Sequence, residues 1–331
     1  MCFSDFSCFG GVKHLIFSLI VFLAPTVLGG EVRKEKDIPY LGPDREEKMD
    51  AYRPADSWKR PLPAVIWIHG GGWSGGEKAG KREQNVCRTL AENGYVAFSI
   101  DYRLATKAPA AGSPSGAGKG PGTGGDEEGD SSSSLIVPWP QNYYDCKSAL
   151  RYIRKEAAHF GVDPNRIAVA GGSAGGHLAL LTGVTGNVAE MNKGGLHTNQ
   201  SNKVSCIVDF YGVSKIVEDK RIKKFAGATP AETEANVKAA SPATYFGKDT
   251  PPILVVHGAA DGTVKVRYSR EMVEKLKALG IPHEYIEIPG APHSFDLQPK
   301  ERDLRPDVLE FLGKHLGKPA SLSGDSSLSK E

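Results

Sequence analysis

The chain has 331 residues, of which 40% are hydrophobic and 8% aromatic, with 41 Lys and Arg residues against 39 Asp and Glu residues. This balance is typical of a globular protein with a buried core, and it excludes a disordered or collagen-like chain. The net charge of +2 is too small to recruit nucleic acid or an anionic membrane. We therefore expect neither as a partner.

The N-terminal stretch Leu15–Leu28 is apolar, follows Lys13 and ends before two glycines. This pattern predicts a secretory signal peptide over residues 1–30, and hence a secreted or periplasmic protein. The stretch is shorter than the roughly 20 residues that cross a bilayer, and Pro25 interrupts it, so a retained anchor is the weaker interpretation. We expect no stable membrane span in the mature chain.

Apolar runs alternate with stretches of helical period along most of the chain. Because the runs lack period-2 alternation, they are typical of strands covered on both faces. The expected strands are Lys48–Arg53, Ala64–Ile68, Tyr95–Ile100, Arg166–Ala170, Val204–Phe210, Ile253–Val256 and Glu284–Ile288. The expected helices are Lys81–Asn93, Asn142–Phe160, Ala174–Thr182, Val266–Leu279 and Arg305–Leu316. This order predicts an α/β fold over residues 31–318, with a mostly parallel sheet and helices on both faces.

Two segments depart from this pattern. Pro109–Ser134 holds 8 Gly, 6 Ser and 3 Pro in 26 residues and contains no Ile, Leu, Val or aromatic residue, which predicts a flexible surface insertion. The Ser-rich residues 319–331 are expected to be a disordered tail. The stretch Gly212–Lys248 is irregular and helical in parts, and it is interpreted as a lid or side wall of a pocket.

Three cysteines, Cys87, Cys146 and Cys206, follow the predicted signal peptide. They are odd in number and lack C-x-x-C or Cys/His ligand spacing. We expect buried free thiols, with one disulfide at most, and no metal site.

The sequence Gly171-Gly-Ser173-Ala-Gly175 follows an expected strand and precedes an expected helix. A nucleophile on a sharp strand-to-helix turn needs small neighbours two residues away on each side, and glycine meets that need. Ser173 is therefore the candidate nucleophile. The alternative is an ordinary glycine-rich turn with a helix-capping serine.

His69-Gly-Gly-Gly-Trp73 follows another expected strand. Consecutive glycines allow backbone N–H groups to point into a pocket and stabilise an oxyanion. A phosphate-binding turn is the alternative, but no Gly-Lys-Ser/Thr or dinucleotide spacing accompanies the motif.

An acid and a histidine then follow in the order that such a nucleophile requires. Asp261 follows the strand at Ile253–Val256, and His293 follows the strand at Glu284–Ile288. Asp209 also follows a strand and is the alternative acid. The order predicts a triad of Ser173, Asp261 and His293.

Together with Asp101-Tyr-Arg103, His257-Gly-x-x-Asp261 and Pro292-His-Ser-Phe295, these motifs resemble the α/β-hydrolase esterases, in the branch of hormone-sensitive-lipase-like and bacterial feruloyl or acetylxylan esterase-like proteins. The resemblance covers residues 48–316. It implies the same triad, the α/β-hydrolase fold, and an oxyanion hole formed by the N–H groups of Gly71, Gly72 and Ala174. We expect neither a metal nor a cofactor.

The remaining motif residues are assigned more local roles. Trp73 either lines the substrate pocket or caps its loop, and Tyr102 is a candidate substrate contact. His69 is expected to hold its loop by hydrogen bonds, and His177 is expected to be a packing residue. Asp101 and Arg103 are expected to form an ion-pair network at the end of a strand.

The sequence thus predicts a secreted serine hydrolase that cleaves carboxylic esters, with short acyl or feruloyl esters of polysaccharide as candidate substrates. Two alternatives stay open: a serine peptidase on the same fold, and a non-catalytic binding protein. The length of the acyl chain, the alcohol and the oligomeric state are not predicted.

Overall fold

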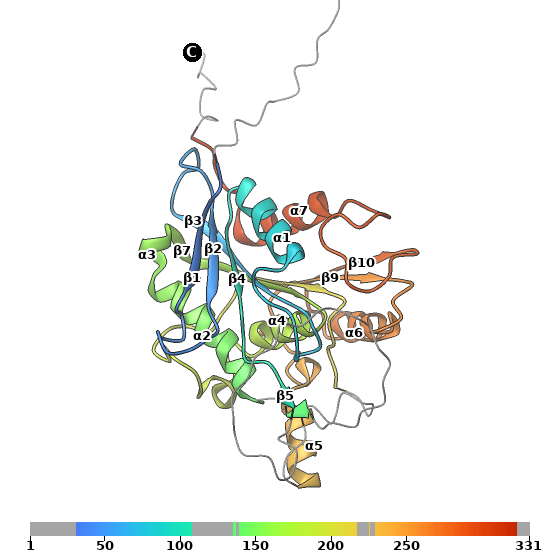
Figure 1. The fold of residues 1–331 in the computed structure, drawn as a ribbon. Coiled ribbons are helices and arrows are strands. Elements are labelled where there is room, and N and C mark those ends of the chain that lie inside the picture. Colours follow the sequence, from blue (N-terminus) through green and yellow to red (C-terminus); the bar gives the residue numbers. More distant parts are fainter. Residues whose placement is uncertain (1–30, 108–134, 137–138, 217–224, 226–228, 323–331) are drawn as a thin grey trace, which may run out of the picture.

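The computed structural model describes residues 31–107, 135–136, 139–216, 225 and 229–322 (Figure 1). The predicted signal peptide, the insertion Pro109–Ser134 and the end of the predicted tail lie outside these residues. Within the described part, no helix is both long enough and apolar enough to cross a membrane.

A single sheet of eight strands organises the described chain, in the order β1-β2-β4-β3-β7-β8-β9-β10. The strands are β1 Arg33–Ile38, β2 Met49–Arg53, β3 Leu62–Ile68, β4 Val96–Ile100, β7 Val162–Gly172, β8 Cys206–Phe210, β9 Ile253–Gly258 and β10 His283–Ile288. Strands β4, β3, β7, β8, β9 and β10 run parallel to one another, whereas β1 is antiparallel to β2 and β2 is antiparallel to β4. The carboxyl ends of β3, β7, β8, β9 and β10 therefore meet at one edge of the sheet.

Helices cover both faces of this sheet (Figure 1). One face carries α1 Lys81–Glu92 and α7 Arg305–Leu316. The other carries α2 Gln141–Lys155, α3 Ala157–Phe160, α4 Ala174–Val184 and α6 Arg267–Ala278. Every residue of β3, β8 and β9 is buried, which explains why their sequences do not alternate between apolar and polar residues.

Several elements were not assigned bounds from the sequence, although the stretch Gly212–Lys248 was expected to be helical in parts. Strand β1 has the charged sequence RKEKDI and only one buried residue, because it lies at the edge of the sheet. A short pair of strands, β5 Thr106–Lys107 and β6 Leu135–Ile136, flanks the insertion. The irregular stretch contains helix α5 Pro230–Ala239 and the 3₁₀ turn η3 Pro242–Thr244, and another 3₁₀ turn, η1, covers Ala189–Asn192.

The predicted boundary of the tail is wrong by a few residues. The backbone N–H of Lys59 donates to the carbonyl of Ala320 at 2.8 Å, and that of Leu322 donates to the carbonyl of Ser57 at 2.7 Å. The chain pairs here because residues 57–59 offer backbone groups that need partners. Ordered packing thus continues to residue 322.

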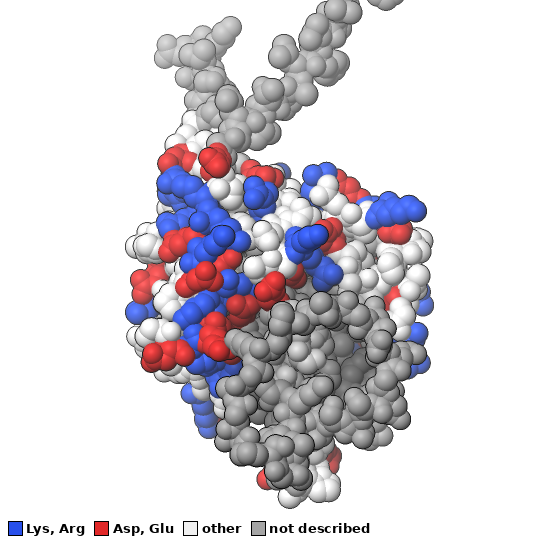
Figure 2. Space-filling view, in the orientation of Figure 1, with Lys and Arg blue, Asp and Glu red and all other residues white. Residues whose placement is uncertain are grey.

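Cys87, Cys146 and Cys206 are free and buried, as predicted. Burial raises the pKa of each thiol. On the outer surface, the face in Figure 2 shows Lys and Arg side chains interleaved with Asp and Glu side chains, in keeping with the small net charge.

Candidate active site

Ser173 stands on a sharp turn between β7 and α4, at φ 56° and ψ −120°. This backbone conformation is rare for a residue with a side chain and marks local strain. The turn is possible because of the glycines beside it. A Cβ on Gly175 would lie 2.0 Å from the carbonyl oxygen of Ile68, and one on Gly171 would lie 2.5 Å from the backbone of Gly175.

His293 lies between Ser173 and Asp261. Its Nε2 is 3.0 Å from Ser173 Oγ, and its Nδ1 is 2.6 Å from Asp261 Oδ2. Because the carboxylate only accepts, Nδ1–H donates to it, and Nε2 is left to accept from the serine hydroxyl. The loops after β7, β9 and β10 thus bring the three predicted residues into one hydrogen-bonded line.

The side chain of Asp261 is fully buried and accepts four hydrogen bonds. Its Oδ1 accepts from the backbone N–H groups of Thr263 and Val264, each at 2.8 Å. Its Oδ2 accepts from His293 and from His257 Nε2 at 3.1 Å. Burial alone would raise the pKa of Asp261, but the bonds from His257, His293 and Val264 outweigh it and lower that pKa. The carboxylate is held ionised.

The loop that carries His293 is fixed from two sides. The hydroxyl of Tyr211 donates to the carbonyl of Phe295, and the Tyr211 ring lies 4.8 Å from the His293 ring. From α1, Arg82 Nη2 donates to the carbonyl of Ser294 at 2.9 Å. The imidazole is therefore positioned before any substrate arrives.

The loop His69–Trp73 lies against the turn of Ser173. A Cβ on Gly70 would be 2.9 Å from the carbonyl oxygen of Gly172 and 3.4 Å from the Cβ of Ser173. Gly71 and Gly72 follow at φ 106° and 59°, in the left-handed region that favours glycine. The structure thus brings the predicted oxyanion loop next to Ser173, and Ala174 follows Ser173 as the first residue of α4.

His69 and Tyr102 hold this loop by hydrogen bonds and by stacking of their rings. His69 is buried, its Nδ1 is 2.7 Å from the carbonyl of Gly70, and burial lowers its pKa. Its ring stacks on Tyr102 at 4.5 Å, and the Tyr102 hydroxyl donates to the His69 carbonyl at 3.1 Å. His69 holds the loop as predicted. Tyr102 is buried beneath it, and its contact with substrate stays a prediction.

Trp73 and His177 connect the loop to α4 and to the segment before η3. Trp73 Nε1 donates to His177 Nδ1 at 3.2 Å, and His177 Nε2 donates to the carbonyl of Ala240 at 2.6 Å. Burial lowers the pKa of His177 to about 4, so the ring is neutral at pH 7. His177 packs as predicted. Trp73 is 3% exposed and also packs on Phe225, so these contacts cap the loop, and its contact with substrate stays a prediction.

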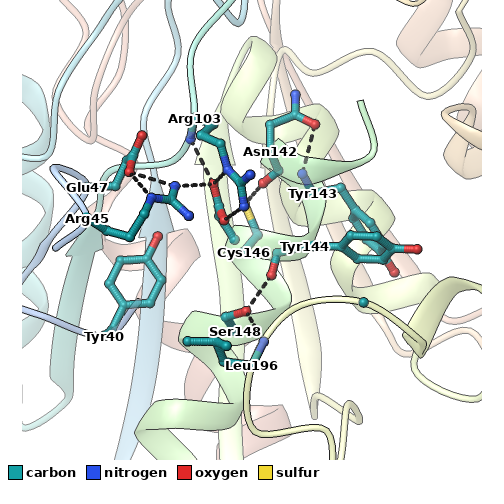
Figure 3. Close-up of polar contacts among 12 residues, drawn as sticks. Tyr40, Arg45, Glu47, Arg103, Asn142, Tyr143, Tyr144, Cys146, Ser148 and Leu196 are labelled. Atoms are coloured by element: carbon teal, nitrogen blue, oxygen red, sulfur yellow. Dashed lines mark hydrogen bonds and ion pairs between the residues drawn. The ribbon is translucent and has the colours of Figure 1, made fainter. Parts of the chain in front are cut away.

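Arg103 belongs to an ion-pair network, as predicted, but Asp101 is not its partner. Arg103 forms a bidentate pair with the buried Asp145 of α2, with Nε–Oδ2 at 2.9 Å and Nη2–Oδ1 at 2.8 Å, and Arg45 approaches the same carboxylate (Figure 3). Asp101 instead accepts from the backbone N–H of Lys78 at 2.7 Å. The buried carboxylate on α2 requires a cation, and Arg103 reaches it.

Asp209, the alternative acid, lies behind the turn and not against His293. Burial raises its pKa to about 7, its Oδ1 accepts from the Gly212 N–H at 3.0 Å, and its Oδ2 has no hydrogen-bond partner within the described chain. The geometry therefore favours Asp261 as the partner of His293.

Two residues of this site, His257 and Tyr211, were not assigned a role from the sequence. His257 was already visible in the motif His257-Gly-x-x-Asp261, but spacing alone does not show that its side chain turns toward the aspartate. Tyr211 directly follows β8, and its φ of 43° has no signal in the sequence. Among the described residues, no cluster of three or more His, Cys, Asp or Glu side chains is arranged to hold a metal ion.

A mostly parallel sheet with Ser173 on the turn after β7, and with Asp261 and His293 on later loops at the same edge, defines an α/β-hydrolase fold. More specifically, the chain belongs to the BD-FAE family, whose model matches residues 49–114 and 132–276. The resemblance predicted from the motifs is confirmed.

Relatives and solved structures agree with this assignment. Esterase LipC of Mycobacterium tuberculosis is 31% identical over 267 residues, which are 77% of this chain and 59% of that protein. The chain likewise spans 53% of the probable carboxylic ester hydrolase LipM of the same organism, with 30% identity over 73% of this chain. Among solved structures, a thermophilic esterase of Thermogutta terrifontis has a TM-score of 0.61 and 26% identity, with coverage of 89% of this chain and 95% of that one. A truncated carbohydrate esterase from gut microbiota has a TM-score of 0.70 at 24% identity, with coverage of 86% and 97%, and supports the fold alone.

Proposed function

We propose that this protein hydrolyses carboxylic esters through an acyl-enzyme on Ser173. The observation that carries the proposal is the hydrogen-bonded line from Ser173 through His293 to the buried Asp261, on a strained turn beside a glycine-rich loop. The names of the relatives, which are esterases and carboxylic ester hydrolases, support it.

In the first half of the reaction, His293 Nε2 takes the proton of Ser173 as Oγ attacks the acyl carbon. Asp261 holds the imidazole in the tautomer that leaves Nε2 free to accept, and it stabilises the imidazolium that forms. The N–H groups of Gly71, Gly72 and Ala174 stabilise the oxyanion. His293 then gives the proton to the leaving alcohol.

In the second half, water replaces the alcohol. His293 removes a proton from water as it attacks the acyl carbon, and returns it to Ser173 Oγ as the acid leaves. The partly exposed His293 and the fully buried Asp261 suit these roles, because the imidazole must meet water while the carboxylate must not.

We further propose that the acyl group is short and that esters of polysaccharide are among the substrates. The Thermogutta terrifontis esterase was solved with propionate and with butyrate bound, which supports a short acyl group. The resemblance of the motifs to acetylxylan esterase-like proteins supports polysaccharide esters. Feruloyl esters stay a candidate from the motif resemblance.

We also propose that the chain is exported. The apolar stretch Leu15–Leu28 after Lys13 supports this proposal. Expression of the full chain, followed by N-terminal sequencing of the exported product, tests it. A product that keeps residues 1–30 would contradict cleavage.

The test of the activity is a panel of substrates with the purified protein and its Ser173→Ala variant. The panel contains p-nitrophenyl acetate, butyrate and octanoate, acetylated xylan, a feruloyl ester and an aminoacyl anilide. We expect turnover of the short esters that the variant loses. Turnover of the anilide alone would indicate a peptidase, and a folded protein that turns over nothing would indicate a binding protein.

A further inference from the structure

We infer that His257 is a positioning residue that holds the carboxylate of Asp261 for His293. The inference rests on the proposed function in so far as Asp261 is the acid of the triad. What points to it is one shared atom, Oδ2 of Asp261, which lies within hydrogen-bond distance of both imidazoles.

The contacts of His257 define which of its nitrogens carries a proton. Nε2 lies 3.1 Å from Asp261 Oδ2 and 2.8 Å from the carbonyl oxygen of Val264. Both neighbours only accept, so Nε2–H donates to them. Nδ1 lies 2.7 Å from the hydroxyl of Ser269 on α6, which donates to the neutral ring. His257 and Ser269 are both buried, so water does not compete for these bonds.

His257 therefore completes the set of partners around the acid. With His257 in place, Oδ1 of Asp261 accepts two backbone N–H groups and Oδ2 accepts two imidazole N–H groups. A carboxylate held by four donors cannot turn away from His293 when the imidazole moves during the reaction.

Other charged groups face His257 from the neighbouring strands. Asp209 approaches from β8, Glu287 is its register partner on β10, and the Tyr211 ring lies 6.5 Å away. Glu287 is itself paired with Arg270 at 2.5 Å. Asp261 remains the acidic group that His257 contacts directly, so the effect of replacing His257 is expected at the triad.

The experiment compares His257→Leu, which removes the donor, with His257→Gln, whose amide N–H can replace Nε2–H. His283→Leu is the matched control, because His283 is the first residue of β10 and lies away from the carboxyl ends of the strands, where Asp261 and His293 lie. We measure the pH profile of kcat/KM on p-nitrophenyl acetate and the melting temperature of each variant. For His257→Leu we expect kcat to fall about tenfold or more with little change in KM.

The acid limb of the His257→Leu profile should also move to lower pH, because a carboxylate that can turn away from His293 stabilises the protonated imidazole less. His257→Gln should restore both the rate and the limb. A limb that stays in place or moves to higher pH, or a loss of rate that Gln does not restore, would overturn the inference. If the Leu variant does not fold, His257→Asn takes its place, since its amide is too short to reach Asp261.

A second readout does not depend on ester hydrolysis. The Nδ1 proton of His293, assigned by its loss in His293→Ala, should give a low-field proton NMR resonance that moves upfield in His257→Leu, because the hydrogen bond to Asp261 is weaker there, and returns in His257→Gln. An unmoved resonance would overturn the positioning role. A moved resonance in a protein that cleaves no ester would instead contradict the proposed function and leave the positioning role standing.

Discussion

At the scale of single residues, the line of Ser173, His293 and Asp261 has a kinetic consequence. Groups that act as one unit lose most of their effect when any one of them is removed. We expect Ser173→Ala and His293→Ala each to lower kcat about 10⁵-fold or more while the protein stays folded. Assays of both single variants and of the double variant on p-nitrophenyl acetate check this.

The double variant provides the decisive comparison for the triad. It should be no slower than Ser173→Ala alone, because the remaining imidazole has no serine to activate. A double variant far slower than either single variant would mean that the two residues act independently, and the triad assignment would be wrong.

For Asp209 we predict an effect on the stability of the fold and not on the rate of ester hydrolysis. Burial raises its pKa from 3.8 to about 7. Between these two values the folded state binds more protons than the unfolded state, so the contribution of Asp209 to stability falls as pH rises through this window. Asp209→Asn removes the titrating group. The free energy of unfolding of the variant minus that of wild type should therefore increase from pH 4 to pH 8, by roughly 4 kcal/mol at most.

Urea unfolding of wild type and Asp209→Asn at pH 5 and at pH 8 measures this difference. Asp249→Asn is the control, because Asp249 is exposed. The control should show the same difference from wild type at both pH values. If Asp209→Asn behaves like the control, the carboxyl group is ionised across the whole range.

At the scale of elements, the packing of the turn against β3 predicts that Gly175 tolerates no side chain. An alanine Cβ there would lie 2.0 Å from the carbonyl of Ile68 and 2.4 Å from that of His69, and neither backbone can move without shifting β3. We expect Gly175→Ala to lose activity and about 3 kcal/mol of stability or more. Gly247→Ala, where nothing lies within 4 Å of the new Cβ, should be close to neutral in the same unfolding experiment. Equal effects at both sites would contradict this account.

Most of these elements were predictable, and the exceptions have physical causes. Buried parallel strands such as β3 and β9 carry their own signal, a run of apolar residues. Strand β1 carries none, because an edge strand can be formed by charged residues that keep their side chains in water. The hydrogen-bonded line of Ser173, His293 and Asp261 was predictable because strand ends and chain order bring these residues together. The contact between Arg103 and Asp145 was not, because it depends on how α2 lies over the sheet.

The insertion offers a test of what composition alone predicts. Strands β5 and β6 pair Thr106 with Ile136 and Lys107 with Leu135, so their ends already lie where a tight hairpin would join them. We expect replacement of residues 108–134 by Asn-Gly to change the melting temperature by only a few degrees, since a shorter loop lowers the closure cost by about 0.6 kcal/mol per halving. Activity on p-nitrophenyl acetate should survive.

A chain in which a Gly-Ser repeat of equal length replaces residues 108–134 is the matched control. It should behave like wild type if the segment contributes no core. Loss of folding in both variants would show that the segment contributes packing and that the compositional interpretation is wrong. Loss of folding in the Asn-Gly variant alone would show that the chain requires a longer connection between β5 and β6.

At the scale of the whole molecule, the sheet separates two hydrophobic layers, and the free cysteines report on both. Cys87 and Cys206 belong to the layer under α1 and α7, whereas Cys146 lies in the layer under α2 and α4. Strands β2, β3, β4, β7, β8 and β9 each place buried residues in both layers, so neither layer can lose its packing while the other keeps it. The described chain should then unfold as one cooperative unit.

Thiol labelling of the chain that begins at residue 31 tests this cooperativity. We expect no reaction of a thiol reagent with the native protein, because all three thiols are buried and burial raises their pKa values. The reactivity of each thiol is measured in a variant that keeps only that cysteine. As guanidinium is added, Cys146 should become reactive at the same midpoint as Cys87 and Cys206. Reductant should leave the melting temperature unchanged, since the fold contains no disulfide between these residues. An earlier midpoint for Cys146 would show that the layer under α2 and α4, which also packs α4 behind Ser173, opens independently of the rest.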